Sequence, residues 1–183
     1  MTDQVAPETP PVEVDPVVAK LQERFAERIR EADTSGDHPA FVVDRGDLLD
    51  VLTFLRDDPD LQFVRLSDIT AVDYLGRVPR FALVYHVYSF ASSRYARVRV
   101  PVDEDDAVVP SSTVLWPGAN YFEREVFDMF GIAFAGHPNL TRILTPDDWT
   151  DHVLRKDFQP PPEPIEFSIN PDQWQKAVQR GSE

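Results

Sequence analysis

Seven of the acidic and histidine side chains between residues 123 and 152 are candidates for a catalytic or metal site. They are Glu123, Glu125, Asp128, His137, Asp147, Asp148 and His152. Carboxylates can bind a divalent cation, and a carboxylate pair can act as general acid and base. The spacing E-x-E-x-x-D alone predicts little, and no H-E-x-x-H or G-x-S-x-G pattern accompanies it. A free-standing hydrolase that uses Glu125 and Asp128 is therefore one hypothesis, and a structural ion-pair network is the favoured interpretation.

A short helix must position the first of these residues. Pro117 suits a helix start, and Gly131 suits the position just beyond a helix end. The residues between them are mostly aromatic or aliphatic, so we expect burial, and buried charges then need partners. Arg124 and Asp128 are four residues apart and can pair on one helix face. Further partners follow the helix (Arg142, Arg155 and Lys156), and we predict that at least one helix carboxylate bonds to that segment.

Residues 132–158, called the arm from here on, show almost no hydrophobic periodicity. Unpatterned loops of this length are uncommon, and they are usually functional or disordered. The arm contains too many large apolar side chains for disorder. We therefore predict an extended arm that lies on the surface of a partner, and a turn at His137-Pro138 with a hydrogen-bonded imidazole.

Length and composition predict one compact domain with tails. The chain has 183 residues, of which 42% are hydrophobic. We expect a disordered segment at 1–15, a compact domain at 16–131, and a proline-rich tail at 159–183 after the arm. No run of 18 apolar residues is present, and the acidic, proline-rich start does not have the pattern of a signal peptide. These features predict a cytoplasmic protein.

Charge and cysteine content exclude several classes of function. The net charge of −14 disfavours direct binding to nucleic acid or to an anionic bilayer. No cysteine is present, so the chain offers no disulfide and no thiolate ligands for an iron–sulfur cluster. The seven glycines form no G-x-G-x-x-G or Walker pattern. We expect no redox cofactor and no metal in this chain.

The remaining elements predict the fold class. An amphipathic helix begins at Pro16, repeats apolar residues every four positions through Ile29, and fades at 34–37. A second helix is expected at 46–56, with strands at 40–43, 61–66, 81–90 and 94–102 and a turn at 76–80. His86 is interpreted as a core residue rather than a ligand. Short turns between strands favour antiparallel pairing, so we predict a two-layer α+β fold: a mixed, mostly antiparallel sheet packed with helices, followed by a long irregular C-terminal arm.

The helix and the arm together carry a family resemblance. The pattern consists of Glu123-Arg124-Glu125-x-x-Asp128-x-x-Gly131-Ile132, then Gly136-His137-Pro138-x-Leu140-x-Arg142-Ile143-Leu144, then Leu154-Arg155-Lys156-Asp157-Phe158. It resembles the signature of the C subunit of bacterial NADH-quinone oxidoreductase, respiratory complex I, over roughly residues 40–158. One departure is Asp151-His152-Val153, where the family usually has Gly-His-Pro.

The resemblance implies a cofactor-free structural subunit of the peripheral arm of that complex. FMN and iron–sulfur clusters would belong to partner subunits, and the chain would pack beside the quinone-site subunit and neighbouring iron–sulfur subunits on the cytoplasmic face of the membrane. It marks the following as signature or interface residues: Glu123, Arg124, Glu125, Asp128, Gly131, His137, Pro138, Arg142, Arg155, Lys156 and Asp157. Two alternatives stay open: the equivalent component of a membrane-bound hydrogenase or related dehydrogenase, and a contribution of Arg155 or Lys156 to the quinone site.

Overall fold

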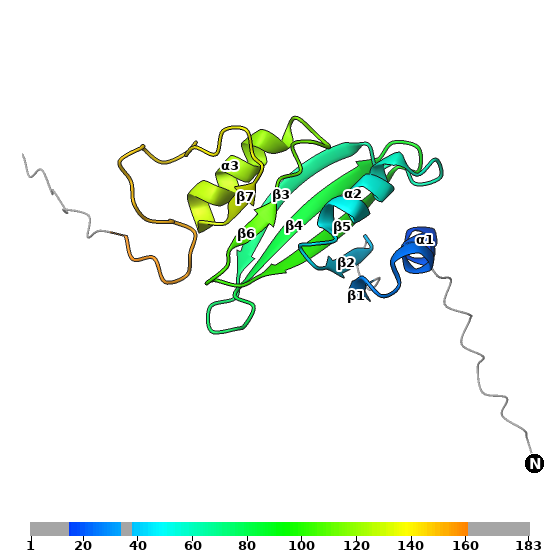
Figure 1. Cartoon of the computed structure of the whole chain (residues 1–183), viewed down its shortest axis with the longest axis horizontal. Coiled ribbons are helices and arrows are strands. Elements are labelled where there is room, and N and C mark those ends of the chain that lie inside the picture. Colours follow the sequence, from blue (N-terminus) through cyan, green and yellow to red (C-terminus); the bar gives the residue numbers. More distant parts are fainter. Residues whose placement is uncertain (1–14, 34–37, 161–183) are drawn as a thin grey trace, which may run out of the picture.

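The computed structural model describes residues 15–33 and 38–160. The predicted N-terminal segment, apart from residue 15, and the tail beyond residue 160 lie outside these ranges. A five-stranded sheet has the strand order β1-β2-β5-β4-β3, and a two-stranded sheet pairs β6 with β7 (Figure 1). The strands are β1 (Ile29–Asp33), β2 (Ala40–Val43), β3 (Arg65–Asp73), β4 (Phe81–Ser89), β5 (Arg94–Val102), β6 (Val108–Pro110) and β7 (Ala133–Ala135). The helices are α1 (Pro16–Phe25), α2 (Leu48–Asp57) and α3 (Ala119–Phe130).

The large sheet is mixed and mostly antiparallel, as predicted. β2 pairs with β5 in parallel, and the other neighbours pair antiparallel. Alternate residues of β5 are buried, from Ala96 to Val102, and they join the apolar faces of all three helices in one core. The helices therefore cover one face of the sheet, and the predicted two-layer α+β fold is confirmed.

Two predicted elements have different limits in the structure. The first helix ends at Phe25 instead of continuing, because Ile29 pairs with Val43 in a β-hairpin. The four-residue spacing of Ile29 fits a helix equally well, so only the partner strand decides. The strand predicted at 61–66 begins only at Arg65. Leu61 and Phe63 are buried in the preceding loop, whose chain turns back toward α2 through a bond from the Phe63 N–H to the Leu55 carbonyl.

The predicted helix of the signature is confirmed as α3. It packs against β3 and ends at Gly131, which has a left-handed conformation with φ +77°. The arm then begins with β7, which pairs in parallel with β6, so its first residues are a regular strand where the sequence predicted irregular chain. Within the described ranges no helix is long and apolar enough to cross a bilayer.

Candidate partner-binding site

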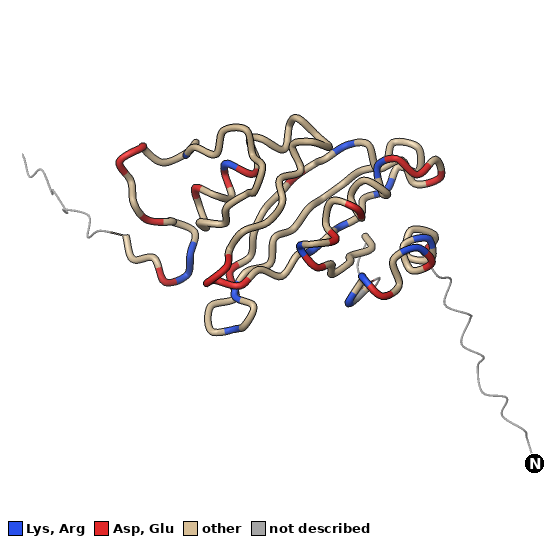
Figure 2. Tube along the Cα trace, viewed as in Figure 1, with Lys and Arg blue, Asp and Glu red and all other residues tan. Residues whose placement is uncertain are grey.

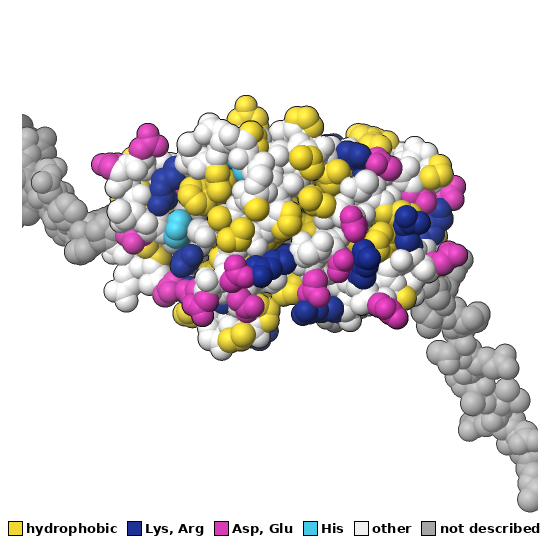
Figure 3. All heavy atoms as spheres, viewed as in Figure 1, with side chains coloured by type: hydrophobic (Ala, Val, Ile, Leu, Met, Phe, Trp, Pro, Cys, Tyr) yellow, Lys and Arg dark blue, Asp and Glu magenta, His cyan; other side chains and the backbone are white. Residues whose placement is uncertain are grey.

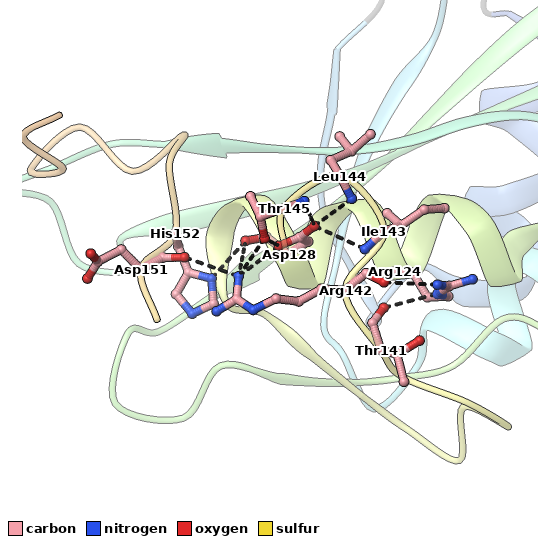
Figure 4. Close-up of polar contacts among 9 residues, drawn as sticks. All are labelled: Arg124, Asp128, Thr141, Arg142, Ile143, Leu144, Thr145, Asp151 and His152. Atoms are coloured by element: carbon pink, nitrogen blue, oxygen red, sulfur yellow. Dashed lines mark hydrogen bonds and ion pairs between the residues drawn. The ribbon is translucent and has the colours of Figure 1, made fainter. Parts of the chain in front are cut away.

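Asp128 is the centre of the contacts between α3 and the arm (Figure 4). Its side chain is fully buried. Oδ2 accepts hydrogen bonds from the backbone N–H groups of Ile143 at 3.1 Å, Leu144 at 2.8 Å and Thr145 at 2.9 Å. Oδ1 accepts from Arg142 Nη1 at 2.7 Å and from the Thr145 hydroxyl. Residues 142–145 thus fold around one carboxylate, which confirms that a helix carboxylate bonds to the segment that follows.

These bonds determine the ionisation of Asp128. Burial alone would raise the pKa of its carboxyl group, because it disfavours the charged form. The donors from Thr145, Leu144 and Arg142 outweigh burial and hold the pKa well below its usual range. Asp128 is therefore a carboxylate at neutral pH and acts as a structural anchor.

The arm also satisfies the last carbonyl groups of α3, which have no partners within the helix. The Asp128 carbonyl accepts from His152 Nδ1 at 2.9 Å, and the Met129 carbonyl accepts from the Leu154 N–H at 3.1 Å. The Phe130 carbonyl accepts from Arg155 Nε at 2.6 Å. The positive charge of Arg155 also complements the negative end of the helix dipole. The arm is thus the cap of this helix end.

Gly131 lets the arm approach this closely. A Cβ atom built on it would lie 2.5 Å from His152 Nε2 and 2.6 Å from Arg155 Nη2. Its positive φ is also a conformation in which side chains are strained. The signature therefore requires glycine here for two separate reasons.

The other charged residues of α3 have different surroundings. Arg124 does not pair with Asp128 as their spacing allowed; it donates Nε to the Thr141 carbonyl at 3.0 Å and Nη2 to the Arg142 carbonyl at 2.9 Å. Arg124 bonds to these arm carbonyls because the oxygens of Asp128 already accept hydrogen bonds from the arm. Glu125 is exposed, and no hydrogen bond or ion pair of its carboxylate occurs within the described part of the chain.

Among the described residues, the Glu123 carboxylate takes its hydrogen bonds from outside the arm. This buried carboxylate accepts hydrogen bonds from the Ser111 hydroxyl and from the backbone and hydroxyl of Ser112, each at 2.7 Å. This signature residue therefore stabilises the loop that follows β6. At the start of the arm, the predicted turn is confirmed: His137 Nε2 donates to the Asn120 carbonyl at 3.2 Å, and Nδ1 accepts from the Asn139 N–H at 3.0 Å. Pro138 is exposed in this turn.

A second anchor holds the far end of the arm; the sequence marked its arm residues Lys156 and Asp157 but not Asp73 and Arg80 of the domain. Buried Arg80 donates to both oxygens of buried Asp73 at 3.0 and 2.9 Å and to Asp157 at 2.7 Å. Asp73 also accepts from the Lys156 N–H at 2.9 Å. The Arg80 guanidinium lowers the pKa of both carboxyl groups. The available signal was that Arg80 ends the predicted turn at 76–80, directly before an apolar strand, and that Asp73 lies shortly before that turn.

The geometry does not bring the candidate acid and metal residues together. Glu123 and Asp128 use their oxygens on separate sets of donors. Among residues 15–33 and 38–160, no group of three histidine or acidic side chains is arranged to hold a metal ion. The site therefore holds the arm against the domain, and we call the two anchors, Asp128 and Asp73–Arg80, with their arm partners the clamp.

The outer surface of α3 and the arm carries several large apolar side chains. Leu144 is 63% exposed and Leu154 is 53% exposed, and Tyr121 and Ile143 are also exposed in α3 and the arm. Hydrophobic side chains also gather in the middle of the molecular face in Figure 3, between charged margins. The arm thus bonds to α3 through some of its polar groups and exposes large apolar side chains together with charged ones such as Asp147, Asp148 and Lys156.

Sequence comparison identifies the family. Residues 41–164 match the family described as respiratory-chain NADH dehydrogenase, 30 Kd subunit. The chain is 55% identical over 125 residues to the C subunit of NADH-quinone oxidoreductase of Roseiflexus sp. (strain RS-1), covering 68% of this chain and 72% of that protein. It is 44% identical over 152 residues to the C/D subunit of NADH-quinone oxidoreductase of Psychrobacter cryohalolentis, covering 79% of this chain and 26% of that protein. The chain belongs to the family of the 30 Kd subunit of respiratory-chain NADH dehydrogenase.

Solved structures agree with this assignment. A trypsin-resistant fragment of Nqo5 is 34% identical, with a TM-score of 0.59, and the match covers 67% of this chain and 97% of the fragment. A chain of the membrane-bound sulfane sulfur reductase, an archaeal respiratory membrane complex, is 25% identical, with a TM-score of 0.65. That match covers 87% of this chain and 89% of the other. The fold is therefore also present in a chain of an archaeal respiratory membrane complex.

Proposed function

We propose that this chain is the structural C subunit of proton-translocating NADH:quinone oxidoreductase and that it holds no cofactor itself. The complex passes electrons from NADH through FMN and iron–sulfur clusters to quinone. In this proposal the chain lies in the peripheral part of the complex, on the cytoplasmic face of the membrane. The arm is the surface through which it contacts the quinone-site and iron–sulfur subunits.

One observation carries this proposal: the arm is already folded, and it exposes large apolar side chains on its outer side. Two buried anchors, Asp128 and Asp73, bond to arm backbone and fix its shape. Leu144 and Leu154 then face outward, where solvent contact is unfavourable and burial against a partner is favourable. A preformed apolar surface loses less conformational entropy on binding than a flexible segment does.

A relative supports the choice of partner. The Psychrobacter cryohalolentis protein is named as a combined C/D subunit, and this chain matches only 26% of its length. A polypeptide that carries both subunits keeps them adjacent. We infer that the D subunit is the principal neighbour of the arm.

The test uses the intact complex. A tagged chain purified from its own membranes should bring down the other subunits together with NADH-dependent quinone reduction. The double variant Leu144→Glu/Leu154→Glu should lose most of that activity because it places two charges in the apolar contact. Leu75→Glu is the matched control, since Leu75 is 50% exposed in the turn between β3 and β4, outside the arm. Full assembly of the double variant would contradict the proposal.

A further inference from the structure

The exposed charges of α3 and the arm are almost all negative. From residue 119 to residue 158, the exposed charged side chains are one lysine and five carboxylates: Lys156, Glu125, Asp147, Asp148, Asp151 and Asp157. Acidic positions recur along the outer course of the arm in Figure 2. The surface that exposes Tyr121 and Leu144 is therefore also an acidic surface.

The clamp and the end of α3 use the arginines of the same region. Arg124 donates to two carbonyls of the arm, and Arg142 donates to the Asp128 carboxylate. Arg155 donates to the Phe130 carbonyl at the end of α3. All three arginines are half-buried. Their charge thus serves groups of this chain, whereas most carboxylates of the arm face solvent.

Three of the exposed carboxylates have no role inside the described part of the chain. Glu125, Asp147 and Asp148 take part in no hydrogen bond or ion pair among the described residues. Glu123 and Asp128 differ in this respect, because both are buried and their oxygens accept several hydrogen bonds. Asp147 and Asp148 are also neighbours in the sequence, and their like charges repel each other. These carboxylates therefore do not stabilise the folded arm.

The unpaired carboxylates lie beside the exposed apolar side chains. Tyr121 and Glu125 are four residues apart on α3, and Asp128 follows one turn later, so the three form one row along the helix. The arm covers the Asp128 end of this row, where the Leu144 N–H bonds to the carboxylate. Asp147 follows Leu144 at no more than about 11 Å of chain. Apolar and acidic side chains thus occupy one surface.

We propose that this surface binds a basic segment of the neighbouring subunit, in which lysine or arginine side chains stand beside large apolar ones. The apolar side chains of the segment pack on Tyr121 and Leu144, and its cations pair with Glu125, Asp147 and Asp148. Complementary charges determine the orientation and specificity of such a contact more than its affinity, which the apolar pairs supply. This contact rests on the proposed function, which makes the arm a contact surface, and it specifies the chemistry of the occupant.

Charge reversal in the intact complex tests the sign of the occupant. Asp147→Lys/Asp148→Lys should reduce the fraction of chain recovered in the complex by about tenfold, because lysines then oppose cations. Glu23→Lys/Glu27→Lys is the matched control. It changes the net charge equally, at exposed carboxylates in α1 and just after it, and α1 lies at the other end of the molecule from the arm (Figure 1). Unchanged recovery of the arm variant, or equal losses in both variants, overturns the proposal.

Salt dependence gives a second measurement with a milder variant. Asp147→Asn/Asp148→Asn removes the two charges with little change of shape. Recovery of the wild-type chain should fall as the salt concentration rises from about 0.1 M to about 1 M, because the screening length shortens from about 10 Å to about 3 Å. The neutral variant should lose most of this dependence. An equally steep fall in both chains would show that these carboxylates do not contact a cation of the partner.

The leucine variant of the arm keeps two different failures apart. Full assembly of Leu144→Glu/Leu154→Glu contradicts the proposed function and the basic occupant together. Loss of assembly in that variant, combined with normal assembly of Asp147→Lys/Asp148→Lys, overturns only the basic occupant and leaves the apolar contact in place.

Discussion

The sheet domain and the arm meet along α3 and are stabilised by different interactions. The domain is held by a continuous apolar core in which the helices cover one face of the sheet. The arm buries Ile132 and Phe134 in that core at its start, and beyond β7 it is held by hydrogen bonds to two buried aspartates and to the end of α3. Apolar burial depends on area and tolerates changes of detail, whereas a buried carboxylate depends on each of its donors. The two regions should therefore respond very differently to single substitutions.

Removal of the Asp128 charge should have the largest effect on the arm. Asp128→Asn leaves Arg142 without its carboxylate partner and places an amide opposite backbone donors. Breaking a buried ion pair in this way costs about 3–5 kcal/mol. Hydrogen exchange of the amides at 143–145 should accelerate correspondingly, while the amides of β4 and β5 keep their protection.

Glu123→Gln provides the matched comparison on the same helix. It also replaces a buried carboxylate by an amide, but its donors come from Ser111 and Ser112. The cost of about 1–3 kcal/mol should appear in the domain and not in the arm. Equal loss of arm protection in both variants would show that the two regions are not independently stabilised.

Acid should loosen the same anchor without a mutation. The folded-state pKa of Asp128 is depressed, so its contribution to stability is complete above the ordinary carboxyl pKa of about 4 and is lost as the pH falls toward the folded-state value. Asp73 has a depressed pKa as well and acts in the same direction. We expect NMR amide signals of the arm to change below about pH 4 before those of the central strands. In Asp128→Asn the arm signals should lose most of this dependence, and an unchanged titration would contradict the assignment of the anchor.

Local signals made most of the domain predictable. Strict alternation from Arg94 to Val102 identified β5 and its buried face, and Gly131 identified the end of α3. An apolar helix with embedded charges also predicted the bond between α3 and the arm. Each of these conclusions depends on residues that are close in the sequence or on the cost of burying a charge.

The features that the sequence predicted wrongly or missed all depend on partners that are distant in the sequence. Ile29 fits a helical repeat, and only pairing with Val43 makes it a strand. The anchor of Asp73 and Arg80 joins Lys156 and Asp157 of the arm, and no spacing rule relates positions so far apart. Arg124 likewise changed partners because arm donors occupied Asp128.

Gly131→Ala tests the close approach of the arm to the end of α3. The left-handed backbone costs an L-residue about 1–2 kcal/mol, and the new Cβ also displaces His152 and Arg155. Gly136→Ala is the control, because Gly136 has φ +81° but no atom within 4 Å of the added Cβ. Thermal unfolding should show a larger loss for Gly131→Ala, and the difference measures the contact with the arm. Identical losses would mean that backbone strain alone requires glycine.

Arg124→Met should give the smallest effect. It keeps most of the length of the side chain but leaves the carbonyls of Thr141 and Arg142 without their donor. Because these carbonyls lie near solvent, water can replace the lost bonds, and we expect a loss of about 1 kcal/mol in arm stability by hydrogen exchange. Arg77→Met is the control and should leave the hydrogen exchange of the arm unchanged, because Arg77 is exposed and lies outside the arm. If Arg124→Met instead released the arm as fully as Asp128→Asn, the arm would depend on its carbonyl contacts as much as on its buried carboxylate, and the single-anchor account of residues 142–145 would be wrong.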